Sequence, residues 1–338
     1  MGEQWNGIVV RSTLSEQGTV PRDALATSPD IALAGVAPFP DPAILTDPAN
    51  YDTVYGNGLY IGAPNYLYVR GKNGTPDGLS GSWNLFWATP NILLYPYLWQ
   101  NNAIATSSGN LNPGFSISPG AIGASADPFA WVPSDMADCY CLVAVANTPG
   151  YGNPLLGVSD IASLASALAL NANIAQHNVH SIRGNLPQVV FESGYDQGDE
   201  PALVDVSVIF ENIPKGSSYT ISAGTPLNGQ VLSHYDTNTT QANFTYAWVD
   251  LEIPAQWDTM FTCVITFGSD WSGIPTNQKP TVTIRADLVQ ESSQALYQLG
   301  SDAGENPHTG QPRLDSSGGP VRVVTAGSFG VVCPDVGP

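Results

Sequence analysis

Apolar side chains recur at every second position over several stretches of this chain, and this period of two constrains the fold more than any other feature. Residues 202–210 and 281–288 show the period most clearly. Successive side chains of a β-strand point to opposite faces of a sheet, so the period predicts half-buried strands. Similar runs at 243–251, 259–268 and 321–333 bring the second half to roughly seven or eight strands, which is the spacing of a β-sandwich.

Strand signals in the first half are more aromatic. Three runs, at 60–70, 82–88 and 92–99, are separated by turn-forming residues and predict consecutive antiparallel strands. Residues 137–146 are apolar on both faces, which is typical of a strand inside a sandwich.

One helix is predicted, at residues 159–172. Ile161, Leu164 and Leu168 recur at helical spacing after Ser159 and Asp160, which can cap the first turn. The segment 173–182, after the helix, is predicted to form a strand.

Together these patterns predict an all-β protein with two β-sandwich domains, Ig-like or jelly-roll-like in type, and one short helix near 159–172. The 34 Gly and 28 Pro residues interrupt the chain too often for long helices. We place the first domain at residues 1–186, with a long extended N-terminal segment, and the second at residues 187–338. Residues 300–319 are rich in Gly, Asp, Asn, Pro and Ser and are predicted to form a long mobile loop.

The charge balance excludes some partners. The chain carries 29 Asp and Glu against 10 Lys and Arg, a net charge of −19. Such a surface repels phosphate groups, so we expect no nucleic-acid partner and no binding to anionic membranes. A basic protein partner or a divalent cation fits the charge better.

The sequence shows neither a transmembrane segment nor a signal peptide. It has no run of about 18 apolar residues, so no transmembrane segment is predicted. Residues 2–11 lack the basic start and apolar middle of a signal peptide, which predicts a leaderless chain that is cytoplasmic before any release.

The four cysteines are Cys139, Cys141, Cys263 and Cys333. Without a second CxC pair or a His at ligand spacing, they predict no metal site. Two interpretations remain, namely buried free thiols and a disulfide between Cys263 and Cys333.

No catalytic residue emerges from the motifs. His177 and His180 are three apart, which in a strand places them on opposite faces, and no GxSxG sequence occurs. A pair of carboxylates of the glycosidase kind stays open, because such residues come from distant positions.

No cofactor is predicted, with calcium as the one alternative. Asp196, Asp199 and Glu200 offer the oxygen ligands that calcium prefers, but their spacing is not that of an EF-hand loop. The alternative interpretation is a solvated acidic turn.

Two aromatic stretches are candidates for contact with a protein or a glycan. In each, aromatic side chains share one face of an expected strand, where they either pack in the core or form an exposed strip. The six candidates are Tyr95, Tyr97, Trp99, Phe244, Tyr246 and Trp248.

The first half also resembles a known family. Residues 27–31, 65–74, 83–88, 140–144 and 173–179 resemble, in order and kind, the adhesion-related, immunoglobulin-like CARDB-type β-sandwich domains of bacterial extracellular proteins. The resemblance covers residues 1–185 only. It implies an extracellular or cell-surface location and transfers no catalytic residues.

Three functions follow as hypotheses. The first is a non-enzymatic β-sandwich protein for adhesion, assembly or binding of a protein or glycan partner, with itself as one such partner. The second is one component of a secreted, two-part protein toxin. The third is a carbohydrate-active protein on a jelly-roll scaffold, which would need two carboxylates about 5 to 10 Å apart in a cleft.

Overall fold

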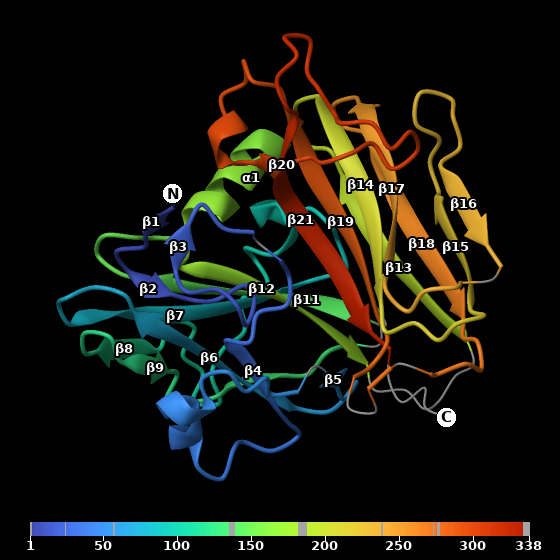
Figure 1. The fold of residues 1–338 in the computed structure, drawn as a ribbon. Coiled ribbons are helices and arrows are strands. Elements are labelled where there is room, and N and C mark those ends of the chain that lie inside the picture. The colour runs from blue at the N-terminus through green and yellow to red at the C-terminus, as the bar shows by residue number, and fades with distance from the viewer. Residues whose placement is uncertain are drawn as a thin grey trace. The chain divides into compact units, whose positions relative to one another are not determined.

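The fold is mostly β, as predicted, with several antiparallel sheets in a sandwich-like arrangement and one short α-helix (Figure 1). The computed structural model describes residues 2–23, 25–56, 58–134, 139–181, 188–237, 239–272, 274–275 and 278–333. In these residues, no helix is long and apolar enough to cross a membrane.

The chain divides into two compact units. The first comprises Met1–Thr89, Leu94–Val158 and Ser166–Ile182, and the second comprises Pro90–Leu93, Ser159–Ala165 and Arg183–Pro338. The domain boundary predicted between residues 186 and 187 lies outside the described residues.

The first unit is built from two sheets that face each other. Strand β6 is the centre of one sheet and pairs with β2, β4, β9 and β10. The other sheet has the strand order β5-β12-β11-β7-β8, and β1 and β3 form a separate pair. The strands are β1 (Glu3–Gln4), β2 (Ile8–Val9), β3 (Thr19–Val20), β4 (Ile31–Gly35), β5 (Gly58–Leu59), β6 (Asn65–Asn73), β7 (Leu79–Ala88), β8 (Gly114–Ile117), β9 (Ile122–Ala124), β10 (Phe129–Trp131), β11 (Cys139–Asn147) and β12 (Ile174–Ser181).

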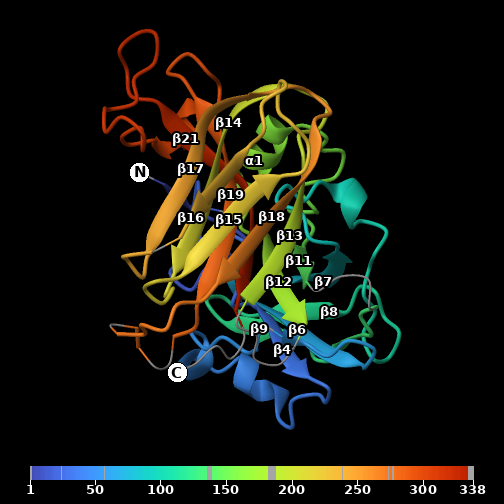
Figure 2. The same cartoon turned by 90° about the vertical axis from the view of Figure 1, so that its right-hand side faces the viewer.

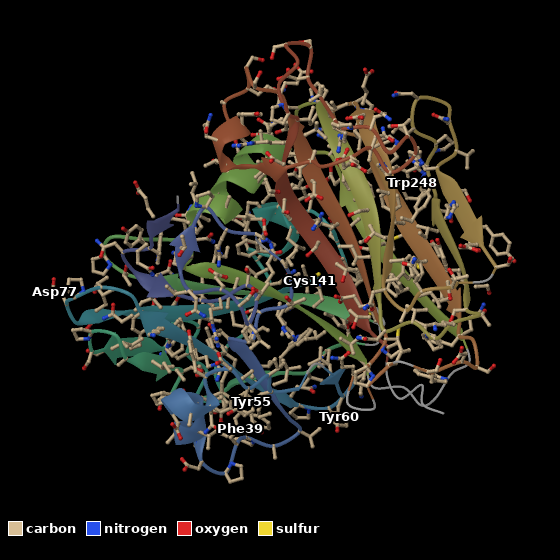
Figure 3. The ribbon with its side chains drawn as sticks, viewed as in Figure 1. Phe39, Tyr55, Tyr60, Asp77, Cys141 and Trp248 are labelled. Atoms are coloured by element: carbon tan, nitrogen blue, oxygen red, sulfur yellow. The ribbon has the colours of Figure 1, made fainter. Side chains whose placement is uncertain are left out.

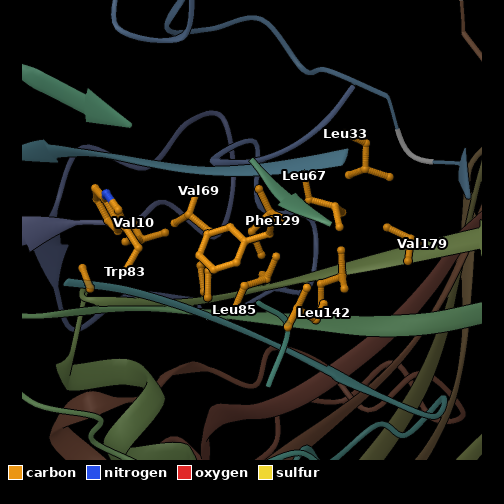
Figure 4. Close-up of a cluster of buried hydrophobic side chains, with 14 of the residues drawn as sticks. Val10, Leu33, Leu67, Val69, Trp83, Leu85, Phe129, Leu142 and Val179 are labelled. Carbon is orange, nitrogen blue, oxygen red and sulfur yellow. The ribbon is translucent and has the colours of Figure 1, made fainter. Parts of the chain in front are cut away.

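The core of this unit lies between the two sheets. Figure 4 shows Leu67 and Val69 of β6 with Phe129 on one side, and Leu85 and Leu142 on the other. All five side chains are buried, and burying each one removes apolar surface from water, which is the main force that holds the sheets together. A smaller cluster includes Phe39 and Tyr55, whose ring centroids are 5.2 Å apart (Figure 3).

The second unit is also a pair of sheets. One has the strand order β13-β18-β15-β16 and the other β17-β14-β19-β21-β20. The strands are β13 (Gln188–Asp196), β14 (Ala202–Glu211), β15 (Ser218–Ala223), β16 (Ser233–Asp236), β17 (Phe244–Ile253), β18 (Asp258–Thr266), β19 (Thr281–Gln290), β20 (Ser301–Asp302) and β21 (Arg322–Val332).

Strand β17 forms an edge of its sheet and is interrupted by a bulge. The register shifts between Val204 and Val206 of β14, so that two residues of β17 lie opposite Asp205. One of them, Asp250, has a φ of 55° and donates its backbone N–H to Asp205 Oδ1 at 2.9 Å. A β-bulge bends its strand and breaks the regular ladder of hydrogen bonds at that point.

The predicted helix is present as α1 (Ile161–Leu170), and its predicted cap is confirmed. Asp160 Oδ1 accepts the backbone N–H of Ser163 at 2.8 Å. The short 3-10 helices are η1 (Pro42–Leu45), η2 (Pro48–Asn50), η3 (Pro96–Leu98) and η4 (Tyr297–Leu299).

Residues 300–319, which we expected to be a mobile loop, are held to the sheet by an arginine. Arg313 Nη2 donates to Asp205 Oδ1 at 3.1 Å and to Asp250 Oδ1 at 2.6 Å, and Arg313 is buried. Hydrogen-bonded pairs of this kind, out of water, fix a loop in one position.

Candidate functional site

The first aromatic stretch is not a strand. Pro96 starts the 3-10 helix η3, because proline fixes φ and has no N–H to donate to a ladder. Tyr95 and Trp99 are buried, and the Trp99 indole donates to the carbonyl of Leu94 at 2.9 Å. Only Tyr97 of the three candidates is exposed, so of the two interpretations the structure shows core packing for Tyr95 and Trp99 and no exposed strip of three rings.

The second aromatic stretch is a strand, but its rings face inward. Phe244, Tyr246 and Trp248 lie on β17 and are half-buried (Figure 3 labels Trp248). The Phe244 ring stacks on Phe210 with centroids 4.5 Å apart, and Trp248 lies 6.0 Å from Phe261 of the facing sheet. These three candidates therefore pack between the two sheets of the second unit.

A histidine joins this aromatic cluster. His234 of β16 stacks on Tyr246 with ring centroids 3.7 Å apart, and its Nε2 lies 3.3 Å from the hydroxyl of Tyr219. Burial lowers the pKa of His234, because the charged imidazolium loses its hydration. Burial, and next the charge of Asp236, raise the pKa of Tyr219 to about 12. The cluster closes one edge of the sandwich.

In the acidic turn after β13, the polar groups form hydrogen bonds with nearby residues of the protein. Asp196 Oδ1 accepts the N–H of Gly198 at 2.9 Å, and Asp199 Oδ1 accepts from Gln256 Nε2 at 2.8 Å. The carbonyl of Glu200 accepts from Gln197 Nε2 at 3.0 Å. In the part of the chain that the structure describes, no three His, Cys, Asp or Glu residues gather as a metal site, so the calcium candidates are not brought together.

The disulfide between Cys263 and Cys333 is not formed. All four cysteines are free thiols and are buried. Burial, and next the nearby Cys333, raise the pKa of Cys263, because a thiolate is not solvated there. Cys263 lies on the inward face of β18 and serves as a small apolar core residue.

Two carboxylates do lie opposite each other in the second unit, but each is bonded to an arginine. Asp205 and Asp287 are register partners on β14 and β19. Arg313 binds Asp205, and Arg285 Nε donates to Asp287 Oδ2 at 2.7 Å. Burial raises the pKa of Asp287. Both side chains are buried, which makes the pair a structural part of the sheet.

The sequence analysis missed an exposed surface of the second unit. It is the outer face of the β13-β18-β15-β16 sheet, named here the Val264 face (Figure 2). Its central row crosses all four strands, one further row lies on each side of it, and Met260 lies one row beyond. The face consists of Gln188, Val190, Glu192, Ser218, Thr220, Ser222, Ser233, Tyr235, Met260, Thr262, Val264 and Thr266.

Most side chains on the Val264 face are small, β-branched or hydroxylated. Its central row is Val190, Val264, Thr220 and Tyr235, in strand order, and contains no charge. Val190, Tyr235 and Met260 are exposed. Glu192 is the one charged residue of the face as defined. In Asp258–Thr266, buried and less buried residues alternate, so this face could have been predicted from the sequence once it was known which residues of the strand point into the core.

Comparison with known proteins assigns no family. No family model and no curated protein match the chain. Red sea bream transglutaminase shares 9% identity over 69% of this chain and 28% of its own, with a TM-score of 0.23. The calcium binding domain CBD12 of CALX1.1 shares 8% identity over 65% of this chain and 73% of its own, with a TM-score of 0.19. These matches are a distant structural similarity to β-sandwich domains.

Proposed function

We propose that this chain is a non-enzymatic β-sandwich protein that acts by adhesion, assembly or partner binding, at the bacterial surface or outside the cell. The Val264 face is the observation that carries the proposal. It is a sheet surface with exposed Val190, Tyr235 and Met260 and an uncharged central row. Exposed apolar surface of this kind marks interaction sites.

The charge pattern supports contact at this face. The chain has a net charge of −19, so most of its surface resists the approach of acidic proteins. At the Val264 face a partner can bury Val264 and Thr220 without removing water from charged groups, which would cost free energy. Interface centres are depleted of charge in the same way.

The partner that fits best is a protein of positive net charge. Small β-branched side chains on a sheet face pack well against another protein surface, as facing sheets do in a sandwich. A glycan would be expected to stack on several exposed rings, and Tyr235 is the one aromatic residue of the face. The acidic remainder of the chain would attract a basic partner and speed its association.

The resemblance of residues 1–185 to CARDB-type domains adds support for a location outside the cell. Those domains belong to bacterial extracellular proteins with adhesion-related roles. The arginine partners of Asp205 and Asp287 favour this proposal over hydrolysis, because those buried carboxylates are held as ion pairs.

A matched pair of lysine substitutions tests the proposal. Tyr235→Lys places a charge on the Val264 face, and Leu156→Lys places one on the first unit. The two native side chains are 62% and 64% exposed, so neither change disturbs a core. Fluorescently labelled protein is titrated onto intact bacterial and epithelial cells, and bound protein is measured by flow cytometry.

We expect saturable binding that Tyr235→Lys weakens by roughly tenfold or more, equivalent to about 1.4 kcal/mol, and that Leu156→Lys leaves unchanged. Protease treatment of the cells should abolish binding. If removal of cell-surface glycans, and not protease, abolishes binding, the partner is a glycan and not a protein. If the protein forms a dimer that Tyr235→Lys breaks, the partner is a second copy of this chain. Absence of cell binding, or equal effects of both variants, refutes the role of the face.

A further inference from the structure

A polar cavity of about 810 Å³ opens in the first unit. The N-terminal extended segment, the region after η2 and the ends of β6 and β9 surround it. This volume falls within the range of small-molecule sites in proteins, about 300 to 1,000 Å³. The residues that decide its chemistry are Gln4, Arg11, Gln17, Tyr51, Asp52 and Lys72.

The inner wall of the cavity is preorganised by Arg11. Its Nε and Nη2 donate to the carboxylate of Asp30, with Nη2 to Oδ1 at 2.8 Å, and both side chains are almost completely buried. Arg70 also donates to Asp30 Oδ1, at 3.1 Å. The wall is held in one geometry before any ligand arrives, which lowers the entropy lost on binding.

Tyr51 adds an aromatic surface to this wall. The Arg11 guanidinium carbon lies 3.5 Å from the centroid of the Tyr51 ring. Burial, and next the charge of Asp30, raise the pKa of Tyr51, so the phenol stays neutral and its hydroxyl donates toward Asp30 Oδ2 at 3.4 Å.

Several cationic side chains lie at this cavity or behind its wall. Arg11, Arg22, Arg70 and Lys72 are four of its ten Lys and Arg residues, and they line the cavity or support its wall. Asp30 and Asp52 bind Arg11, Asp30 also binds Arg70, and Glu16 binds Arg22.

Lys72 is the exception among these cations. It is exposed on β6 and lines the cavity, and its ammonium group has no hydrogen-bond or ion-pair partner in the described part of the chain. It therefore leaves one positive charge at the cavity without a protein anion to neutralise it. A ligand carboxylate would supply that anion and gain a charge-assisted hydrogen bond.

The rest of the cavity wall offers both hydrogen-bond donors and hydrogen-bond acceptors. Gln4 Nε2 is bonded to the carbonyls of Gln17 and Gly18, which directs its free amide oxygen elsewhere as an acceptor. The Asp52 carboxylate is 84% exposed and uses one oxygen for Arg11 Nη1 at 3.0 Å. A sugar hydroxyl both donates and accepts hydrogen bonds, so it fits a wall with both donors and acceptors better than a simple anion does.

We propose that this cavity binds an acidic sugar, a sugar unit that carries a carboxylate. Lys72 receives the carboxylate, while the Asp52 and Gln4 oxygens accept from hydroxyls. The site lies wholly within the first unit and is independent of the Val264 face. Binding involves no covalent step.

Calorimetric titration of the full chain with glucuronate and N-acetylneuraminate tests the proposal, with glucose and acetate as probes of each half of the ligand. The key variant is Lys72→Met, which keeps the length of the side chain and removes its charge. Lys215→Met is the matched control, because Lys215 is an exposed lysine of the second unit. Circular dichroism confirms that both variants fold.

We expect saturable binding of at least one acidic sugar, weakened roughly tenfold by Lys72→Met and unaffected by Lys215→Met. Asp52→Asn should weaken the sugar more than it weakens acetate. The proposal is overturned if neither acidic sugar binds at millimolar concentration, if glucose binds as tightly as glucuronate, if acetate alone accounts for the affinity, or if Lys72→Met has no effect.

Discussion

Replacing Asp30 by Asn should destabilise the first unit more than any surface substitution. Asp30 is completely buried and accepts hydrogen bonds from both Arg11 and Arg70. Asn keeps the size of the side chain but removes its charge and turns an NH₂ group toward a guanidinium. Two buried cations then lack their shared anion.

The magnitude follows from that arrangement. Removing one partner of a buried ion pair costs about 3–5 kcal/mol. Because one carboxylate serves two arginines here, we expect the upper end of this range. That loss is a large part of the total stability of a folded domain, about 5–15 kcal/mol. High salt should restore little of it, since buried pairs are poorly screened.

Urea unfolding, followed by tryptophan fluorescence and circular dichroism at pH 7, measures the effect. Asp52→Asn is the control, because Asp52 bonds the same Arg11 but its carboxylate is 84% exposed. An exposed pair contributes at most about 1 kcal/mol. Adding Arg70→Met to Asp30→Asn should recover part of the loss. A change below about 1 kcal/mol for Asp30→Asn, or equal losses for both Asp variants, would refute the reasoning.

Three further outcomes are expected. Phe129→Ala, at a fully buried position, should lower the free energy of unfolding by about 3–5 kcal/mol in urea titrations, whereas Leu111→Ala at an exposed position should change it by less than about 0.5 kcal/mol. The pKa of His234 is lowered by burial, so the folded state takes up a proton less readily than the unfolded state, and stability should fall as the pH drops below 6.5. His234→Phe should keep the ring stacking and reduce that slope in melting curves, and an unchanged slope would contradict the assignment. Arg313→Met should speed proteolytic cleavage within residues 300–319 more than Arg322→Met does, because Arg313 is buried whereas the ion pair of Arg322 with Asp302 is partly exposed.

The strands with strict alternation were predictable from the sequence. The pattern at 281–288 corresponds to β19, and the pattern at 202–210 to β14. Residues 92–99 looked equally strand-like, but Pro96 and the burial of Trp99 turn them into the 3-10 helix η3. A period of two describes a strand only where its backbone N–H groups are free to pair.

The facing direction of a strand was harder to predict. Periodicity shows that Tyr246 and Trp248 share a side of β17, but which side faces the other sheet depends on β16 and β18, which come from other parts of the chain. The same limit concealed the Val264 face.

Buried charges gave almost no signal in the sequence. Arg11 and Arg70 each follow a run of apolar residues, as in Val9-Val10-Arg11, which is the one local hint that they lie inside. Their shared partner Asp30 is 19 and 40 residues away, respectively. Ion pairs between distant residues become visible only when the sheets are assembled.

The bulge in β17 has a consequence for how this protein can associate. An unbroken outer strand offers its free N–H and C=O groups to any extended chain, which invites endless addition of strands and fibre growth. Asp250, with its left-handed backbone, and the exposed acid Glu252 make that strand a poor template. The regular ladder that an added strand would need is therefore interrupted at this edge of the second unit.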